Sequence, residues 1–261
     1  MDGPKKSLGQ HWLHDAAVLQ GIVAAADVQA GDTVLEIGPG LGTLTEKLLA
    51  TGAKVIAVEF DDVLLPALRG RFSDNQNFRL EPGDILKYDF SGLPPNYKIV
   101  ANIPYYLTSQ LLRILTDSTT PPVLAALLVQ KEVAERVCSD PGDMSILAVA
   151  VQLEYDATLG ELVPAALFTP PPKVDSQVLL LKKRYTSLFE GITKHDFMRV
   201  MKAGFSAKRK TLRNTISAGL HLEKPVAEAL LAQAGIDAGR RAETLSLEEW
   251  QLLTKAYTFK A

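Results

Sequence analysis

The sequence predicts an α/β fold with a mostly parallel sheet of about seven strands, followed by a small all-helical domain. Two observations carry this prediction. Short β-rich runs alternate with helical stretches up to about residue 185, and from residue 189 onward the periodicity is entirely helical. Strands that are separated by helices form βαβ units, whose strands pair in parallel with helices on both faces of the sheet. We therefore expect two domains, residues 1–185 and residues 186–261.

Each expected element has its own local signal. The first strand, residues 33–37, is a short apolar run bounded by Gly31-Asp32 and Gly38-Pro39-Gly40. Further strands are expected at 54–58, 78–80, 98–101, 123–129, 157–163 and 176–182. Apolar positions three and four apart predict helices at 43–50, 62–72, 108–115, 195–204, 207–218, 226–234 and 246–257.

The composition is that of a globular protein. The chain has 261 residues, of which 47% are hydrophobic and 22% charged, and its net charge is −2. Cys138 is the only cysteine, so a disulfide scaffold and a cysteine zinc site are excluded. No apolar run approaches the ~20 residues of a membrane span, and the N-terminus lacks the pattern of a signal peptide. We expect a cytoplasmic protein without a membrane anchor.

The charge is unevenly distributed along the chain. Residues 1–185 carry 16 basic and 22 acidic side chains, whereas residues 186–261 carry 12 and 8. Within residues 199–213 there are six basic residues and no acidic one. Such a patch predicts contact with a polyanion at one place; a solvated helix face is the other interpretation.

A glycine-rich loop follows the first predicted strand and opens a helix. It reads Glu36-Ile-Gly38-Pro-Gly40-Leu-Gly42, which is G-x-G-x-G and not the G-x-G-x-x-G of dinucleotide sites. This spacing favours a compact adenosine ligand over a pyrophosphate. A purely structural glycine turn is the alternative.

Two acids follow the next two predicted strands. Glu59 ends the second strand, where a carboxylate can accept bonds from ribose hydroxyls. Asp84, after the third strand, could accept from an adenine amino group, with Ile85 against the ring. Each acid alone could be a strand-end cap, but loops at the carboxyl ends of consecutive parallel strands converge on one crevice.

The fourth predicted strand leads into Asn102-Ile103-Pro104-Tyr105. The carboxamide of Asn102 and the backbone carbonyls near Pro104 are neutral acceptors, and the neighbouring aromatic ring can stack on a planar base. Two acceptors beside a stacking face suit the exocyclic amino group of a nucleobase, which they would orient without a base of matched pKa. A proline turn packed by tyrosines is the structural alternative.

Together these motifs resemble the rRNA adenine N6,N6-dimethyltransferase family, and within it the bacterial small-subunit enzymes. Further matching segments are residues 6–13, 128–134, 168–176, 205–214 and 241–246, so that the resemblance spans nearly the whole chain. It implies a Rossmann-like class I fold that binds S-adenosylmethionine and releases S-adenosylhomocysteine. In the first matching motif, His11 and Trp12 stand where the family usually has Asn and Phe.

The resemblance also implies roles for single residues. Cofactor binding is implied for Gln10, His11, Leu13, Gly38, Gly40, Glu59, Asp84, Ile85 and Asn102. Catalysis is implied for Asn102 and Pro104 as acceptors from the target N6, with Tyr105 stacking on the adenine and Phe168 covering its other face. Phosphate contacts are implied for Lys208, Arg209, Lys210 and Arg213. No metal is expected, because no cysteine or acid cluster joins His11 and His14.

The implied activity is dimethylation of two adjacent adenosines in a hairpin loop near the 3′ end of 16S rRNA, within a precursor of the 30S subunit, by a monomeric enzyme. One alternative is an Erm-type 23S rRNA methyltransferase, although the sequence pI of about 6.1 is low for those basic enzymes. A mainly non-catalytic assembly factor is a second. A DNA adenine methyltransferase is disfavoured because Ile103 stands where the corresponding tetrapeptide of those enzymes commonly has proline. An NAD oxidoreductase is disfavoured by the G-x-G-x-G spacing of the glycine loop.

Overall fold

The computed structural model describes residues 3–5, 8–185 and 191–259. Within them the chain divides into two compact units. The first unit takes in residues 1–135 and 155–183, and the second takes in residues 136–154 and 184–261. The segment 136–154, which we expected in the methyltransferase domain, thus groups with the C-terminal helices. The expected boundary at 185/186 adjoins residues 186–190, which lie outside the described residues, as do Lys6 and Ser7 of the N-terminal motif.

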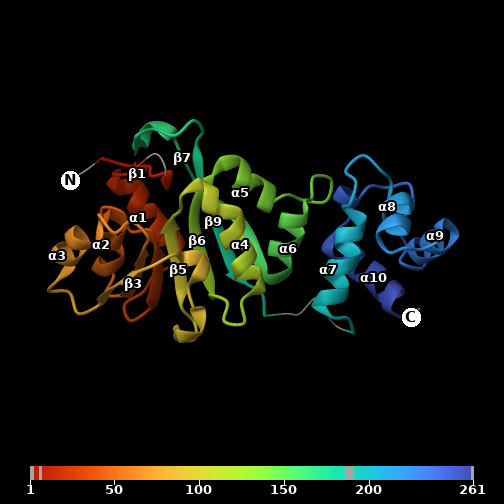
Figure 1. Ribbon diagram of the computed structural model, residues 1–261, viewed down its shortest axis with the longest axis horizontal. Helices are drawn as coiled ribbons and strands as arrows, with labels where there is room; N and C mark the ends of the chain where they lie inside the picture. The colour runs from red at the N-terminus through yellow and green to blue at the C-terminus, as the bar shows by residue number, and fades with distance from the viewer. Residues whose placement is uncertain (1–2, 6–7, 186–190, 260–261) are drawn as a thin grey trace. The chain divides into compact units, whose positions relative to one another are not determined.

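The first unit is built on a seven-stranded sheet (Figure 1). Its strands, in spatial order, are β4 (Phe78–Pro82), β3 (Lys54–Glu59), β2 (Thr33–Ile37), β5 (Lys98–Asn102), β6 (Leu124–Gln130), β9 (Ser176–Lys183) and β7 (Tyr155–Val163). The pairs from β4 to β6 are all parallel, and β9 runs antiparallel to both of its neighbours. The predicted seven-stranded, mostly parallel sheet is confirmed.

The sheet order reverses direction between β2 and β5. The chain moves outward from β2 to β3 and β4, then returns to β5 on the other side of β2. In open α/β sheets, ligands bind at the carboxyl ends of the strands beside such a switch point. The loops after β2, β3, β4 and β5 are those that carry the predicted site.

Helices of the first unit cover the sheet because their apolar residues recur at helical spacing. They are α1 (Ala16–Ala25), α2 (Thr43–Ala50), α3 (Leu65–Phe72), α4 (Thr108–Asp117) and α5 (Lys131–Val137), whose last two residues are assigned to the second unit. Side chains of α1 and α2 form one core cluster with alternate residues of the strands, among them Val34, Val55 and Val100. α3 begins three residues later than expected, because Asp61–Leu64 forms a turn and Pro66 sets the first helical turn.

A short two-stranded sheet was not predicted. It pairs β1 (Trp12–Leu13) antiparallel with β8 (Phe168–Thr169), so that Leu13 lies opposite Phe168. Two-residue strands carry no periodicity of their own, and only the folded chain brings these segments together.

The second unit is helical. Its helices are α6 (Ile146–Glu154), α7 (Lys194–Gly204), α8 (Leu212–Gly219), α9 (Lys224–Gln233) and α10 (Leu247–Thr258) (Figure 1). Trp250 of α10 is fully buried in their common core and stacks on Phe205. α8 begins at Leu212 and not at Ala207, since residues 206–210 form an exposed turn before the helix. None of the described helices has the length and apolar character that a membrane span requires.

Candidate active site

The glycine loop folds tightly at the end of β2. Gly38, Gly40 and Gly42 all have positive φ angles, which side chains other than glycine rarely adopt. The Gly38 N–H donates to the carbonyl of Val58 at 2.9 Å, which holds the loop against the end of β3. A Cβ built on Gly38 would meet no atom within 4 Å, so the backbone there borders open space. The loop leaves room for a ligand at this point.

Glu59 lies beside this loop and is hydrogen-bonded to it. Its carboxylate accepts from the Gly40 N–H at 3.1 Å and from the Asp61 N–H at 2.7 Å. Burial raises the pKa of Glu59, while the two backbone donors act in the opposite direction. The backbone carbonyl of Glu59 accepts from the Gly83 N–H at 2.9 Å, and this bond brings the loop of Asp84 alongside.

Glu36 is more deeply buried, with 1% of its surface exposed. The Thr45 hydroxyl donates to its carboxylate at 2.6 Å. Burial, with a smaller contribution from the charge of Glu59, raises the pKa of the Glu36 carboxyl to about 8. We therefore expect Glu36 to hold a proton at neutral pH in the ligand-free protein.

This shift predicts a pH-dependent stability. Because its pKa is higher in the folded protein than the ordinary value of 4.5, Glu36 lowers the free energy of unfolding as the pH rises from about 4.5 to about 8. Glu36→Gln should remove that part of the decline. The free energy of unfolding of the variant should therefore rise relative to that of the wild type as the pH increases across this range. Urea unfolding at several pH values measures the difference. Parallel curves for the two proteins would contradict the buried, protonated carboxyl.

Asn102 occupies the end of β5, next to the same loops. Its side-chain N–H donates to the His11 carbonyl at 3.2 Å, so its amide oxygen is the atom left to accept from a ligand. The Pro104 carbonyl already accepts from the Leu107 N–H at 2.9 Å. A carbonyl oxygen has two lone pairs, so one acceptor position at Pro104 is still open.

Aromatic rings surround these acceptors. The Tyr105 ring stacks on the His11 ring with centroids 5.7 Å apart, and the Tyr105 hydroxyl bonds the Ser176 hydroxyl at 2.8 Å. His11 Nδ1 lies 2.7 Å from the Pro170 carbonyl; a carbonyl only accepts, so Nδ1 carries the proton. Phe168 is 3% exposed, packs in the core cluster with Leu13 and also borders the site.

The N-terminal segment is tied down by a residue that sequence reasoning missed. Asp61 accepts from Lys5 Nζ at 2.7 Å and from the Gln10 side chain at 3.0 Å. The other end of the Gln10 side chain accepts from the Lys5 N–H at 2.8 Å. Partial burial acts to raise the pKa of Asp61, but these bonds hold it below its ordinary value. Gln10 therefore fastens the segment beside the site, and its predicted contact with a cofactor stays a prediction.

A cavity of about 240 Å³ joins these parts within the first unit. It is lined by every residue for which we predicted a catalytic or cofactor-binding role. Glu36, Trp12, Phe60 and Tyr106 also line it. Phe60 and Tyr106 directly follow the predicted residues Glu59 and Tyr105, and that adjacency is the signal that could have found them. The structure brings the predicted residues together, and their individual roles remain predictions.

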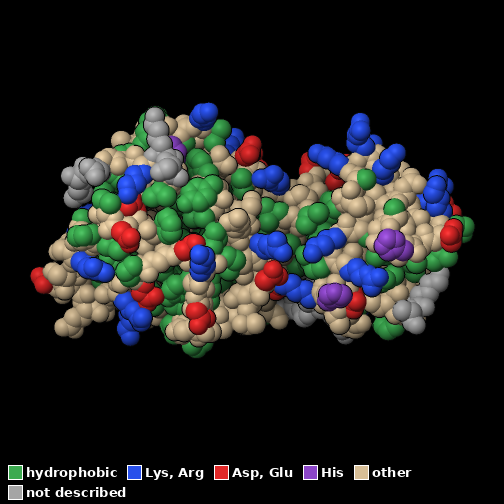
Figure 2. Space-filling model, viewed as in Figure 1, with side chains coloured by type: hydrophobic (Ala, Val, Ile, Leu, Met, Phe, Trp, Pro, Cys, Tyr) green, Lys and Arg blue, Asp and Glu red, His purple; other side chains and the backbone are tan. Residues whose placement is uncertain are grey.

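The predicted phosphate-contacting residues lie in the second unit. Lys208, Arg209 and Lys210 are exposed in the turn before α8, and Arg213 pairs with Glu228 at 3.0 Å. Lys and Arg side chains are spread over the visible face of this unit (Figure 2). The Leu212 N–H at the start of α8 donates to the Arg240 carbonyl at 2.8 Å, so the basic turn rests against a second loop.

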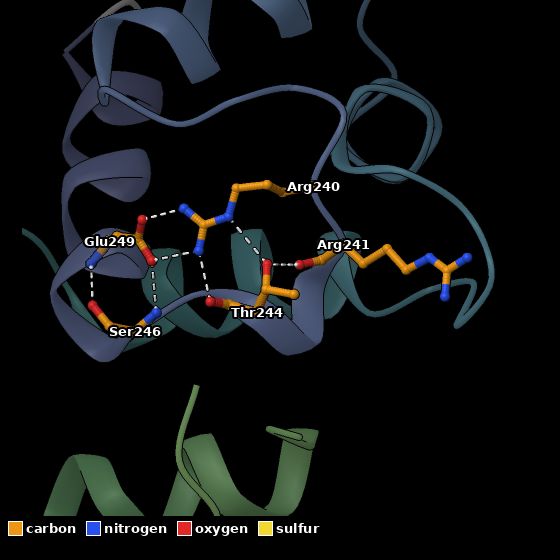
Figure 3. A network of polar contacts seen from close by, with 5 residues as sticks. All are labelled: Arg240, Arg241, Thr244, Ser246 and Glu249. Atoms are coloured by element: carbon orange, nitrogen blue, oxygen red, sulfur yellow. Dashed lines mark hydrogen bonds and ion pairs between the residues drawn. The ribbon is translucent and has the colours of Figure 1, made fainter. Parts of the chain in front are cut away.

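That second loop is fixed by a polar network (Figure 3). The guanidinium of Arg240 forms two bonds with the Glu249 carboxylate and reaches Thr244, and Glu249 also caps α10 together with Ser246. The side chain of Arg241 points away from this network (Figure 3). Arg240 therefore stabilises the conformation of this loop.

Comparison with known proteins places the chain in a family. The family model described as ribosomal RNA adenine dimethylase matches residues 1–258. The chain belongs to the ribosomal RNA adenine dimethylase family. It is 46% identical over 256 residues to a protein of Dehalococcoides mccartyi named ribosomal RNA small subunit methyltransferase A, covering 97% of this chain and 88% of the relative. A protein of the same name from Thermosynechococcus vestitus is 44% identical, with 96% of both chains covered.

Solved structures show the dimethylase fold over nearly the full length. A dimethyladenosine transferase from Plasmodium falciparum superposes with a TM-score of 0.83 at 28% identity, covering 96% of this chain and 98% of the other. The 23S rRNA methyltransferase ErmE superposes with a TM-score of 0.77 at 26% identity, covering 94% and 98%. Both comparisons extend beyond the sheet, because a match confined to residues of the first unit could not cover so much of the chain.

Proposed function

We propose that this dimethylase transfers methyl groups from S-adenosylmethionine to N6 of adenosines in ribosomal RNA. The observation that carries the proposal is the shared cavity. The acceptors Asn102 and Pro104 border the same space as the glycine loop and Glu59. In this proposal, a site for an adenosine-containing donor and a site for an amino group would adjoin each other at the carboxyl edge of one sheet.

The residues of the first unit fit the cofactor. The open space at Gly38 admits the amino-acid part, the carboxylate of Glu59 suits the ribose hydroxyls, and Asp84 with Ile85 suits the adenine. His11, Leu13 and Gly40 complete the wall, and Gln10 fastens the segment that holds His11 and Leu13. Bound S-adenosylmethionine would supply an electrophilic methyl group attached to a sulfonium. After the transfer, the sulfur would remain in the leaving group as a neutral thioether.

Two acceptors prepare the target amine. The nitrogen of an adenine amino group is a poor nucleophile because its lone pair is delocalised into the ring. The Asn102 amide oxygen and the Pro104 carbonyl would accept hydrogen bonds from its N–H groups, and these bonds would orient the nitrogen and return electron density to it. Tyr105 would stack on one face of the base and Phe168 on the other. The target must leave its stack to enter, which favours an unpaired adenosine.

The glycine loop allows a matched test of cofactor fit. At Gly38 and at Gly42, alanine would have to adopt a positive φ, a strain of about 1–2 kcal/mol. At Gly42 the new Cβ would also lie 2.6 Å from Phe72, whereas at Gly38 it would enter open space. Gly42→Ala should therefore lower the free energy of unfolding by about 1–3 kcal/mol more than Gly38→Ala.

Gly38→Ala should in turn lose more affinity for S-adenosylhomocysteine than Gly42→Ala does, because its Cβ enters the ligand space. Urea unfolding and calorimetric titration of both variants measure the two effects. The opposite order of affinities would place the ligand elsewhere.

The proposed substrate is a pair of adjacent adenosines in a hairpin loop near the 3′ end of 16S rRNA, within a 30S precursor in the cytoplasm. The two relatives named for the small subunit support this choice. Lys208, Arg209, Lys210 and Arg213 would hold the RNA backbone without reading its sequence. We propose that the enzyme acts as a monomer and without a metal ion.

The likeness to ErmE keeps a 23S rRNA target as a second candidate. Mass spectrometry of nucleosides separates the two, after incubation of the protein and S-adenosylmethionine with unmethylated 30S particles or with 50S precursors. We expect N6,N6-dimethyladenosine in 16S rRNA alone. Product in 23S rRNA would reverse the choice, and the absence of product in both would refute the proposed activity.

A further inference from the structure

Ser176 is a buried polar residue whose hydroxyl the proposed mechanism does not use. It is the first residue of β9, and its relative exposure is 0%. β9 lies between β6 and β7, and Ser176 pairs in register with Gln130 of β6 and with Val163 of β7. Because it is paired on both sides, the backbone of Ser176 is fixed within the sheet. Its hydroxyl is therefore a firm attachment point.

The side chain attached there is that of Tyr105. The two hydroxyl oxygens lie 2.8 Å apart, and the bond joins residues that are 71 positions apart in the sequence. Among the described residues, neither hydroxyl has a second hydrogen-bond partner. Tyr105 begins a short 3-10 helix, Tyr105–Leu107, in which no residue is buried. Because this helix has no buried anchor of its own, the bond to Ser176 fastens the far end of the ring to the sheet.

One face of the Tyr105 ring is already covered. The His11 ring stacks on it with an angle of 26° between the two planes, and the Pro170 carbonyl holds His11 Nδ1. A target adenine would therefore stack on the opposite face. The orientation of a tyrosine ring depends on two side-chain torsion angles, and contacts at one face and at the hydroxyl restrict them. The ring is thus held in one orientation before a target arrives.

We propose that Ser176 is a positioning residue for the methyl transfer, because it holds the Tyr105 ring in the orientation on which the target adenine stacks. The inference rests on the function proposed above. In this account Ser176 touches neither the cofactor nor the target, since it is buried and does not line the cavity. Its contribution comes through Tyr105, because a ring that is fixed in advance need not be ordered when the base enters.

Three variants test this bond: Ser176→Ala, Tyr105→Phe and the two substitutions together. Each substitution removes one hydroxyl and leaves an aromatic ring at position 105. In single-turnover methylation of 30S particles, each single variant should lower the rate about 3- to 10-fold, the loss expected when one side chain has to be ordered anew. The double variant should lose no more than either single variant, because both substitutions remove the same bond.

Binding measurements separate positioning from a general defect. Calorimetric titration with S-adenosylhomocysteine and filter binding of 30S particles should give wild-type affinities for all three variants, because the cofactor site and the basic turn are untouched. Thr108→Val is the matched control. Thr108 is a buried residue directly after the same 3-10 helix, and its hydroxyl has no hydrogen-bond partner among the described residues. This variant should keep the wild-type rate.

The other outcomes are distinct. A wild-type rate in Ser176→Ala, or losses that multiply in the double variant, would overturn the role of the bond and leave the proposed function standing. A lower thermal midpoint or weaker binding of either ligand, together with the lower rate of Ser176→Ala, would show that Ser176 acts on the fold or on binding and would overturn positioning. The absence of methylation by the wild type would overturn the proposed function as well.

Discussion

Asn102→Ala is expected to lower the rate of methyl transfer by about 10²–10³-fold, the loss typical when one preorganised polar contact to a reacting group is removed. The amide oxygen of Asn102 is the acceptor that orients the target amine in our account, and its side-chain N–H also holds the His11 carbonyl. Single-turnover methylation of 30S particles measures the rate. Affinity for 30S particles should stay close to that of the wild type, because the basic turn is untouched.

Asn77→Ala serves as the matched control, since Asn77 is an exposed asparagine of the same unit away from the cavity. It should keep the wild-type rate. An Asn102→Ala enzyme that methylates normally would remove the central acceptor from the mechanism. If Asn102→Ala, but not Asn77→Ala, showed a lower thermal unfolding midpoint along with its lower rate, Asn102 would have a structural role instead.

Replacing Lys208, Arg209 and Lys210 together by alanine is expected to weaken binding to 30S particles about tenfold or more at low salt. All three are exposed in the turn before α8. Each lost phosphate contact should lower the slope of log affinity against log salt by about 1, so the triple variant should lose about 3. Filter binding over a range of salt concentrations measures both quantities.

The matched control removes the same charge from the first unit. Arg69, Arg79 and Arg113 are exposed there, and their triple replacement by alanine should leave the salt slope nearly unchanged. Affinity for S-adenosylhomocysteine should stay at the wild-type value in both triple variants. An equal change of slope in both would show that total charge, and no particular surface, governs binding.

Most of the sheet could be predicted from the sequence because buried parallel strands are short apolar runs between turns. Residues 33–37 form the first predicted strand, and β2 has the same bounds. The glycine loop, Glu59 at the end of β3 and Asp84 after β4 were found for the same reason: their positions follow from strand ends. Convergence of these loops on one cavity then follows from the parallel topology.

Contacts between distant segments could not be predicted in this way. Asp61 fastens Lys5 and Gln10 across more than 50 residues, and nothing local in the sequence marks that pairing. The grouping of residues 136–154 with the C-terminal helices depends likewise on core packing, since Val149 and Leu153 join the same cluster as Trp250. The start of α8 was placed too early because residues 207–210 have helix-forming composition but lie in an exposed turn, after which Thr211 caps the helix.

The most direct test of the account is a crystal structure of the protein with S-adenosylhomocysteine and a short RNA hairpin that carries two adjacent adenosines. We expect the cofactor in the cavity between the glycine loop and Glu59, and an adenine turned out of the RNA. Its amino group should lie within hydrogen-bonding distance of the Asn102 amide oxygen and the Pro104 carbonyl. A cofactor bound elsewhere, or an Asn102 oxygen turned away from the adenine, would contradict the proposed mechanism.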